Sequence, residues 1–230
     1  MILENASEIL RKMSHAAMRA GRQPDAVRLV AVSKTVPAER VREAMEAGLR
    51  VFGENRVQEA RDKIAALQTS RLEFTGVQWH LIGHLQKNKA KYAVQLFDLI
   101  HSVDSLELAD ELNRQAAKHG KVQRVLIEVK LSDEETKEGI AEEDLGALIA
   151  HVRRCPALSL EGLMTMPPYD PDPEKARPYF RRLRELRDGF TRAEAALPEL
   201  SMGMSHDFAV AIDEGATMVR IGTAIFGGRN

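Results

Sequence analysis

Short apolar runs alternate with amphipathic stretches along the whole chain. The first run, residues 29–32, reads Leu-Val-Ala-Val, and a continuous apolar run of this kind is typical of a parallel strand buried on both faces. Seven more runs follow, and each is separated from the next by a stretch long enough for a helix. The pattern therefore predicts eight strands, at about residues 29–32, 51–52, 79–82, 98–102, 124–129, 158–164, 200–202 and 218–221.

The stretches between the runs have the periodicity and the end signals of helices. Residues 2–20 place apolar side chains on one face and end at Gly21, and Ser105 is expected to cap a later helix. This alternation predicts a (β/α)8 TIM barrel, formed by residues 1–230 as a single domain. Little chain follows the last strand, so the extra N-terminal helix is expected to take the place of a closing helix. An open doubly wound sheet is the alternative, which the absence of a G-x-G-x-x-G motif after the first strand disfavours.

The composition is that of a globular protein with a sizeable core. Hydrophobic residues make up 44% of the chain, and 33 Lys and Arg are balanced by 34 Asp and Glu, which gives no indication of nucleic acid binding. Cys155 is the single cysteine, so a reducing compartment is expected. The first residues lack a basic start followed by an apolar core, and no apolar run reaches membrane-spanning length. We therefore expect a soluble cytoplasmic protein without membrane contact.

Lys34 stands just past the first predicted strand. A charged amine is costly to bury, so a lysine at the end of a buried strand is ion-paired, reaches solvent, or has a lowered pKa and acts as a Schiff-base nucleophile. In a barrel of this type, chemistry takes place where the strands end. The position of Lys34 is therefore compatible with all three possibilities.

Two glycine-rich loops follow the seventh and eighth predicted strands. Residues 201–205 read SMGMS and residues 222–228 read GTAIFGG, so both loops offer hydroxyl groups and backbone N–H groups without bulky side chains. Phosphate sites in such barrels are commonly built from these two loops. Either loop alone could simply form a tight turn, but the two together, opposite Lys34, favour a phosphorylated carbonyl compound as ligand.

Arg220 lies inside the last predicted strand, between apolar residues. A buried guanidinium needs an acceptor. The ring nitrogen of pyridoxal phosphate is one such acceptor, and a carboxylate from a neighbouring strand is the alternative.

Six segments of the chain carry a resemblance to a known family. They are AVSKT at 31–35, FGEN at 52–55, WHLIGHLQ at 79–86, GLM at 162–164, LSMGMS at 200–205 and VRIGTAIFG at 219–227. In identity and order they resemble the pyridoxal phosphate homeostasis protein family, which is similar to the N-terminal barrel domain of alanine racemase. Lys130 and Ala209 depart from the family pattern, and neither stands where the aldehyde or the phosphate would be held.

The resemblance implies a site for pyridoxal 5'-phosphate. The residues that would contact the cofactor are Lys34, Asn55, His84, Ser201, Arg220, Gly222 and Thr223. By the resemblance, Lys34 forms the Schiff base and Arg220 faces the ring nitrogen. Ser201, Gly222 and Thr223 hold the phosphate, and the remaining two residues lie near the cofactor. No histidine has metal-ligand spacing with another histidine or with the cysteine, so no metal is expected.

Two classes of function follow from this resemblance. In the first, the protein is a monomeric carrier that acts in vitamin B6 homeostasis, supplies apo enzymes that need pyridoxal phosphate, and has no catalytic residues of its own. The alternative is an amino-acid racemase or another enzyme dependent on this cofactor, for which Tyr169 is the candidate acid. A Schiff-base aldolase is a third possibility. The carrier is favoured because Arg220 would leave the ring nitrogen unprotonated and because the chain lacks a counterpart of the racemase's second domain.

Overall fold

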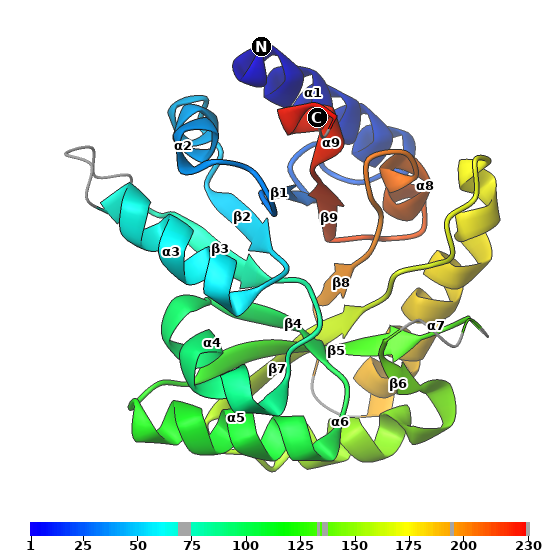
Figure 1. Ribbon diagram of the computed structural model, residues 1–230. Helices are drawn as coiled ribbons and strands as arrows, with labels where there is room; N and C mark the ends of the chain where they lie inside the picture. Colours follow the sequence, from blue (N-terminus) through cyan, green and yellow to red (C-terminus); the bar gives the residue numbers. More distant parts are fainter. Residues whose placement is uncertain (69–74, 133, 135–137, 194–195, 229–230) are drawn as a thin grey trace.

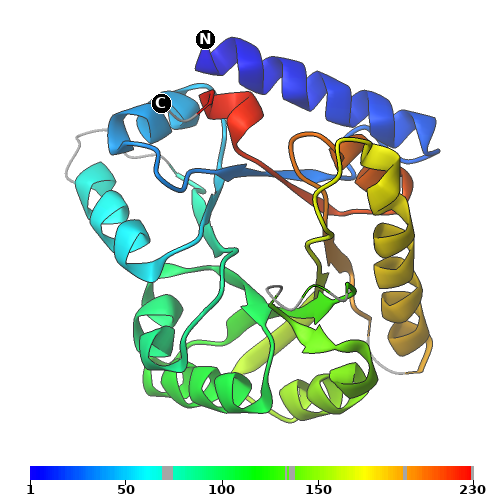
Figure 2. The ribbon, with the colours of Figure 1, turned by 45° about the vertical axis from the view of Figure 1, so that its right-hand side comes forward.

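Eight parallel strands close into a barrel. The computed structural model describes residues 1–68, 75–132, 134, 138–193 and 196–228. The barrel closes because β1 pairs with both β2 and β9 and because β4 pairs with β5, which confirms the predicted TIM barrel (Figures 1 and 2). Its strands are β1 (Arg28–Val32), β2 (Val51–Glu54), β3 (Gln78–Leu81), β4 (Leu99–Val103), β5 (Gln123–Lys130), β7 (Leu158–Met164), β8 (Glu199–Ser201) and β9 (Met218–Ile221). A two-residue strand, β6 (Ile140–Ala141), pairs with the end of β5 and was not predicted.

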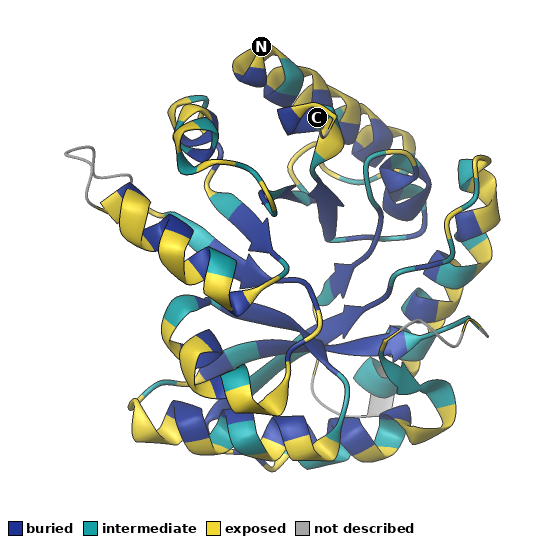
Figure 3. Ribbon diagram, in the orientation of Figure 1, coloured by how far each residue is buried: buried dark blue, intermediate teal, exposed yellow. Residues whose placement is uncertain are grey.

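Helices surround the barrel, with their buried faces toward the strands and their exposed faces outward (Figure 3). Within the described ranges, no helix combines the length and the apolar character needed to cross a membrane. The α-helices are α1 (Ile2–Arg19), α2 (Ala38–Glu46), α3 (Val57–Gln68), α4 (Ala90–Leu96), α5 (Leu106–Lys118), α6 (Leu145–Arg153), α7 (Arg177–Ala193), α8 (Phe208–Asp213) and α9 (Thr223–Phe226). In the described part of the chain, three 3-10 turns accompany them, η1 (Lys87–Lys89), η2 (Glu142–Asp144) and η3 (Pro173–Ala176).

The predicted cap of α5 is correct in position but wrong in mechanism. Ser105 precedes the helix, yet its hydroxyl makes no hydrogen bond to the backbone of the first turn. It donates instead to the carboxylate of Asp104 at 3.1 Å. A neighbouring acceptor has thus replaced the usual capping bond.

Helix α1 lies beside α8 and α9 (Figure 1). The sequence predicted that no long closing helix follows the last strand and that the N-terminal helix takes its place. Its buried face, which includes Ile2, Ile9 and Met13, packs into the outer core. The side-chain amide of Asn5 donates to the carbonyl oxygen of Ile225 at 3.0 Å. The N-terminal helix therefore takes the place of a closing helix next to α8, α9 and α2, as predicted.

A small apolar cluster fills part of the barrel interior. Its members come from six different strands or strand ends and are Val30, Ile82, Leu99, Leu126, Met164 and Met218. The space is tight, because a Cβ added at Gly53 would lie 2.9 Å from a methyl carbon of Val30. Polar side chains that enter this interior must therefore find their partners among one another.

Strands β7 and β8 lie close together at Gly162, which pairs with Glu199. A Cβ added at Gly162 would lie 1.9 Å from the carbonyl oxygen of Glu199. Only glycine fits at this point of the barrel wall, because the obstructing atom belongs to the backbone of the neighbouring strand.

Candidate functional site

The predicted site residues all lie where barrel strands end. Because the strands are parallel, these positions share one end of the barrel. Lys34 is the second residue after β1, Asn55 follows β2 directly, and His84 is the third residue after β3. Continuing around the ring from β1 to β9 and β8, Arg220 lies within β9, Gly222 and Thr223 follow β9, and Ser201 ends β8.

Strand pairing and a shared pocket bring several of these residues close together. Val30 in β1 is in register with Arg220 in β9, so Lys34 and Arg220 come from neighbouring strands. Asn55 and His84 line one pocket of about 310 Å³ together with Arg56 and Lys89. The predicted site residues therefore fall into two groups, one around β1, β8 and β9 and one around β2 and β3.

Arg220 is buried, with 3% of its surface exposed. Its guanidinium donates to the hydroxyl of Ser201 at 2.7 Å and to the carbonyl oxygen of Thr165 at 2.9 Å. Burial lowers the pKa of Arg220 to about 10, while the carboxylates of Glu128 and Asp207 act in the opposite direction. Arg220 is therefore still a cation at neutral pH, and two of its five N–H donors are used in these bonds.

A chain of buried side chains continues from Ser201 into the barrel. The Ser201 hydroxyl lies 2.9 Å from Nδ1 of His101, and Nε2 of His101 lies 3.0 Å from Nδ1 of His80. Burial lowers the pKa of His80 to about 3 and holds that of His101 well below its usual value, so both rings are neutral. Arginine can only donate, so Ser201 must accept from Arg220 and can donate its own hydrogen to His101. The two neutral rings thus extend the hydrogen-bonded chain of Arg220 and Ser201 into the barrel interior.

Ser201, which was predicted to help hold the phosphate, is fully buried, and its hydroxyl is used in bonds inside the barrel. Its hydroxyl contacts Arg220 and His101, whereas Thr223 is exposed and Ser205 is partly exposed. The sequence could not show whether the Ser201 side chain points into the barrel or away from it, because a shift of one residue along a strand reverses the face to which a side chain points.

The loop that carries Lys34 contacts a cluster of charged side chains that the sequence analysis missed. The hydroxyl of Ser33 donates to the carboxylate of Glu54 at 2.6 Å, and the ammonium of Lys63 donates to the same carboxylate at 2.5 Å. Lys63 also donates to Glu59 at 3.0 Å. The signal in the sequence was the pair Glu59 and Lys63, four residues apart on α3 and close to Glu54 at the end of β2.

Two groups of side chains in the described residues offer possible metal ligands. Near the mouth, Nδ1 of His84 lies 3.4 Å from Asp104 and 3.5 Å from Glu138.

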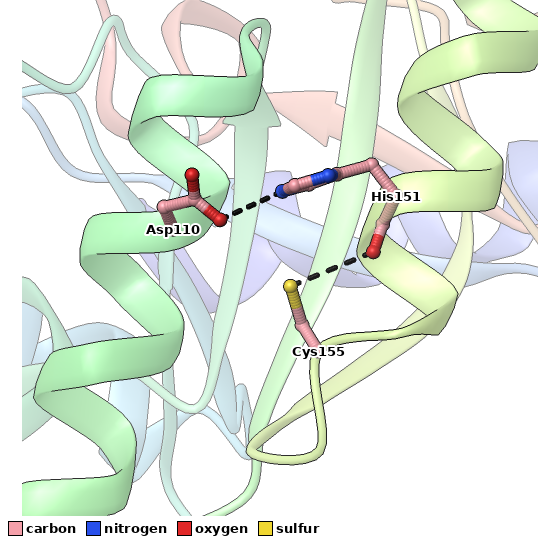
Figure 4. A group of neighbouring side chains, drawn as sticks. All are labelled: Asp110, His151 and Cys155. Carbon is pink, nitrogen blue, oxygen red and sulfur yellow. Dashed lines mark hydrogen bonds and ion pairs between the residues drawn. The ribbon is translucent and has the colours of Figure 1, made fainter.

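Asp110, His151 and Cys155 form the second group between α5 and α6, outside the barrel (Figure 4). There, Nε2 of His151 lies 2.7 Å from the Asp110 carboxylate, and the Cys155 thiol donates to the His151 carbonyl oxygen at 3.5 Å. Ion pairing and hydrogen bonding account for the arrangement of both groups, and the expectation that the chain holds no metal stays a prediction.

Tyr169 was the candidate acid of the racemase alternative. Its side chain is 75% exposed, and its ring lies against that of His206 with 5.0 Å between the centroids. The aromatic contact of Tyr169 is therefore with His206.

Comparison with known proteins gives a consistent result. Residues 6–230 match the family described as "Alanine racemase, N-terminal domain". The chain is 52% identical over 227 residues to the pyridoxal phosphate homeostasis protein of Aquifex aeolicus, which covers 98% of this chain and 97% of that protein. It is 44% identical over 232 residues to the protein of the same name from Escherichia coli K12, covering 100% and 97% of the two chains.

Solved structures extend the comparison. PipY of Synechococcus elongatus PCC7942 with PLP bound has a TM-score of 0.85 and 38% identity, and the match covers 99% of this chain and 100% of that chain. Alanine racemase of Clostridium difficile has a TM-score of 0.68 at 17% identity, over 96% of this chain and 56% of that chain. The second likeness concerns the fold alone.

Proposed function

Because the chain belongs to the pyridoxal phosphate homeostasis protein family, we propose that it binds pyridoxal 5'-phosphate at the barrel mouth and acts in the homeostasis of this cofactor. The observation that carries the proposal is the pairing of β1 with β9. It brings Lys34, the candidate for the aldehyde, and Arg220, the candidate for the ring nitrogen, onto adjacent strands. The PLP-bound PipY structure, at 38% identity, supports the same ligand.

The residues present fit the cofactor. Arg220 offers N–H donors and no acceptor, which suits an unprotonated ring nitrogen. A Cβ added at Gly222 would lie 3.1 Å from the carbonyl oxygen of Val32, so glycine allows the loop after β9 to pack closely against the end of β1. This close packing supports a phosphate held by the backbone N–H groups of Gly222 and Thr223 and by the Thr223 hydroxyl.

The remaining predicted residues have supporting parts in this proposal. Ser201 serves the site through its hydrogen bond to Arg220, which fixes the guanidinium from the barrel interior. Asn55 and His84 line one pocket together, and they would lie beside the cofactor on that side of the barrel mouth. Lys34 forms the Schiff base with the aldehyde.

We propose that the protein holds and releases the cofactor for apo enzymes rather than using it for catalysis. When bound, pyridoxal phosphate supplies an electron sink, which is strongest when its ring nitrogen is protonated. Arg220 keeps its own proton at neutral pH and donates a hydrogen bond, so it supplies no proton to the nitrogen. The Tyr169 ring, the candidate acid of the racemase alternative, is 75% exposed and packs against His206, an arrangement that does not favour an acid held at a fixed place in the site.

The attachment of the cofactor is tested by chemical trapping. Borohydride reduction of the protein loaded with pyridoxal phosphate, followed by peptide mapping, is expected to place the pyridoxyl group on Lys34, and Lys34→Ala should remove the label. Lys89→Ala is the matched control, because Lys89 lines the neighbouring pocket, and this variant should keep the label. A label on Lys87 or Lys89 of the unaltered protein would show that the assignment of Lys34 is wrong.

The absence of robust catalysis is tested by exchange. We expect the loaded protein, incubated with L-alanine in deuterated water, to give no sustained formation of D-alanine. Slow incorporation of deuterium at the α-carbon is compatible with the proposal, because an amine such as Lys34 can act as an occasional base. Multiple turnovers at a rate on the order of 1 per second would instead identify the protein as a racemase.

A further inference from the structure

Lys34 lies between two residues that contact one cluster of charged side chains. The cluster consists of Glu54, at the end of β2, and of Glu59 and Lys63 on α3. Glu54 is fully buried and Lys63 is 7% exposed, although both carry ionisable groups. Such burial is costly, and an ion pair in the interior adds little net stability compared with apolar side chains of similar size. General stabilisation therefore does not by itself explain this buried cluster.

On one side of Lys34, Ser33 is held through its three polar groups. Its backbone N–H donates to the carbonyl oxygen of Gly53 at 2.9 Å, and its hydroxyl donates to Glu54 at 2.6 Å. Its carbonyl oxygen accepts from the ammonium of Lys63 at 2.5 Å. Ser33 therefore cannot change its conformation without breaking several of these bonds.

On the other side, Thr35 has a backbone conformation that a β-branched residue seldom adopts. Its φ is 62°, and no other non-glycine residue in the described part of the chain has a positive φ. The left-handed region costs such a residue free energy, so surrounding contacts must hold it there. The N–H of Thr35 donates to the carboxylate of Glu59 at 2.5 Å, and Glu59 in turn accepts from Lys63 at 3.0 Å.

The cluster also separates the roles of two neighbouring lysines. The ammonium of Lys63 donates to the Ser33 carbonyl oxygen, to Glu54 and to Glu59. These three bonds match its three hydrogens, so it has no lone pair to offer an aldehyde while they are made. Lys63 can therefore order the loop without competing with Lys34 for the same ligand.

We infer that Glu54, Glu59 and Lys63 position Lys34, because they fix the residues on both sides of it and so set the direction in which its side chain leaves the backbone before a ligand arrives. The inference rests on the proposed function. In Schiff-base formation the lone pair of the Lys34 nitrogen attacks the aldehyde carbon, and the aldehyde oxygen leaves as water with the two hydrogens of the neutral amine. A preorganised amine reaches the aldehyde carbon more often than a mobile one, so the cluster should affect the rate of this step. Glu59 is the residue to change, because its side chain is partly exposed and its loss leaves the buried pair of Glu54 and Lys63 intact.

The test compares Glu59→Ala with Glu59→Gln. With pyridoxal phosphate, the rate at which the visible absorbance of the Schiff base appears should fall at least tenfold in Glu59→Ala. It should stay within about threefold of the unaltered protein in Glu59→Gln, because the amide oxygen still accepts the Thr35 N–H. Asp62→Ala removes a carboxylate from the exposed side of the same helix and should leave the rate unchanged. The affinity for pyridoxine 5'-phosphate, which lacks the aldehyde, should be the same in all four proteins.

A second measurement needs no cofactor. Amide hydrogen exchange of residues 33–36 should be at least tenfold faster in Glu59→Ala than in the unaltered protein. Equal absorbance rates or equal exchange would overturn the inference, and so would a parallel loss of pyridoxine 5'-phosphate binding, which would indicate a merely structural role. If exchange accelerates as expected but the unaltered protein forms no Schiff base, the ordering of the Lys34 loop is supported and the proposed function fails.

Discussion

Replacement of Arg220 by methionine is expected to lower the free energy of unfolding by about 3–5 kcal/mol at neutral pH, measured by chemical denaturation without cofactor. Methionine has a similar length, so the loss would not come from a large cavity. The change removes the donors that Ser201 and the Thr165 carbonyl oxygen accept from. It also leaves Glu128, which is 2% exposed, without the nearby positive charge of the guanidinium. A buried charge that loses its counterion is among the most costly defects a single substitution can create.

The matched control is Arg61→Met on the outer face of α3. The Arg61 side chain is 51% exposed and pairs with the adjacent Asp62. Exposed pairs of this kind contribute about 0–1 kcal/mol, so the control should change stability little. A loss below about 1 kcal/mol in Arg220→Met would show that the interior of the barrel does not depend on the buried cation.

Gly162→Ala should prevent the barrel wall from forming as observed and lower the free energy of unfolding by more than about 4 kcal/mol. The added carbon would lie 1.9 Å from the carbonyl oxygen of Glu199 and 2.6 Å from its carbonyl carbon. Backbone atoms in a paired strand cannot move aside as the end of a flexible side chain can. The strain would extend to the site, because β7 leads directly to Thr165, whose carbonyl oxygen binds Arg220.

Gly189→Ala provides the control for this change. Gly189 lies inside α7, and a Cβ added there would meet nothing within 4 Å. Alanine is favoured over glycine by about 0.5–1 kcal/mol in a helix interior, so this variant should be more stable than the unaltered protein. If Gly162→Ala proved as stable as Gly189→Ala, the close approach of β7 and β8 would be wrong.

The strands could be predicted because strands buried on both faces carry apolar side chains at most of their positions. The predicted ranges of β7 and β9 agree with the structure at both ends. The prediction for β2 stopped at Phe52 and omitted its last two residues, Gly53 and Glu54, because neither residue type favours a strand. Both are specified by tertiary contacts, since Gly53 faces the tight barrel interior and Glu54 pairs with Lys63. Strand β6 consists of two partly exposed residues and has no apolar run to indicate it.

The candidate site could be predicted only as far as chain topology determines it. Residues just past parallel strands share one end of the barrel, which places Lys34 and Gly222 in the same region without any side-chain detail. In the sequence alone, Glu59 and Lys63 have the i, i+4 spacing of an ordinary ion pair on a helix surface. Whether such a pair is buried depends on how α3 packs against the loop after β1, and helix periodicity carries no information on that packing.

The closure of the ring through β1 and β9 has a consequence for the time at which the site forms during synthesis. Arg28 pairs with Met218, so strands from nearly opposite ends of the chain must meet. At translation rates of about 5–20 residues per second, β9 leaves the ribosome on the order of ten seconds or more after β1. During that interval the nascent chain has Lys34 but neither Arg220 nor Gly222 beside it. The edge of β1 that will pair with β9 is unpaired during the same interval. Because an unpaired strand edge can bind strands of other chains, aggregation is most favoured before the barrel closes.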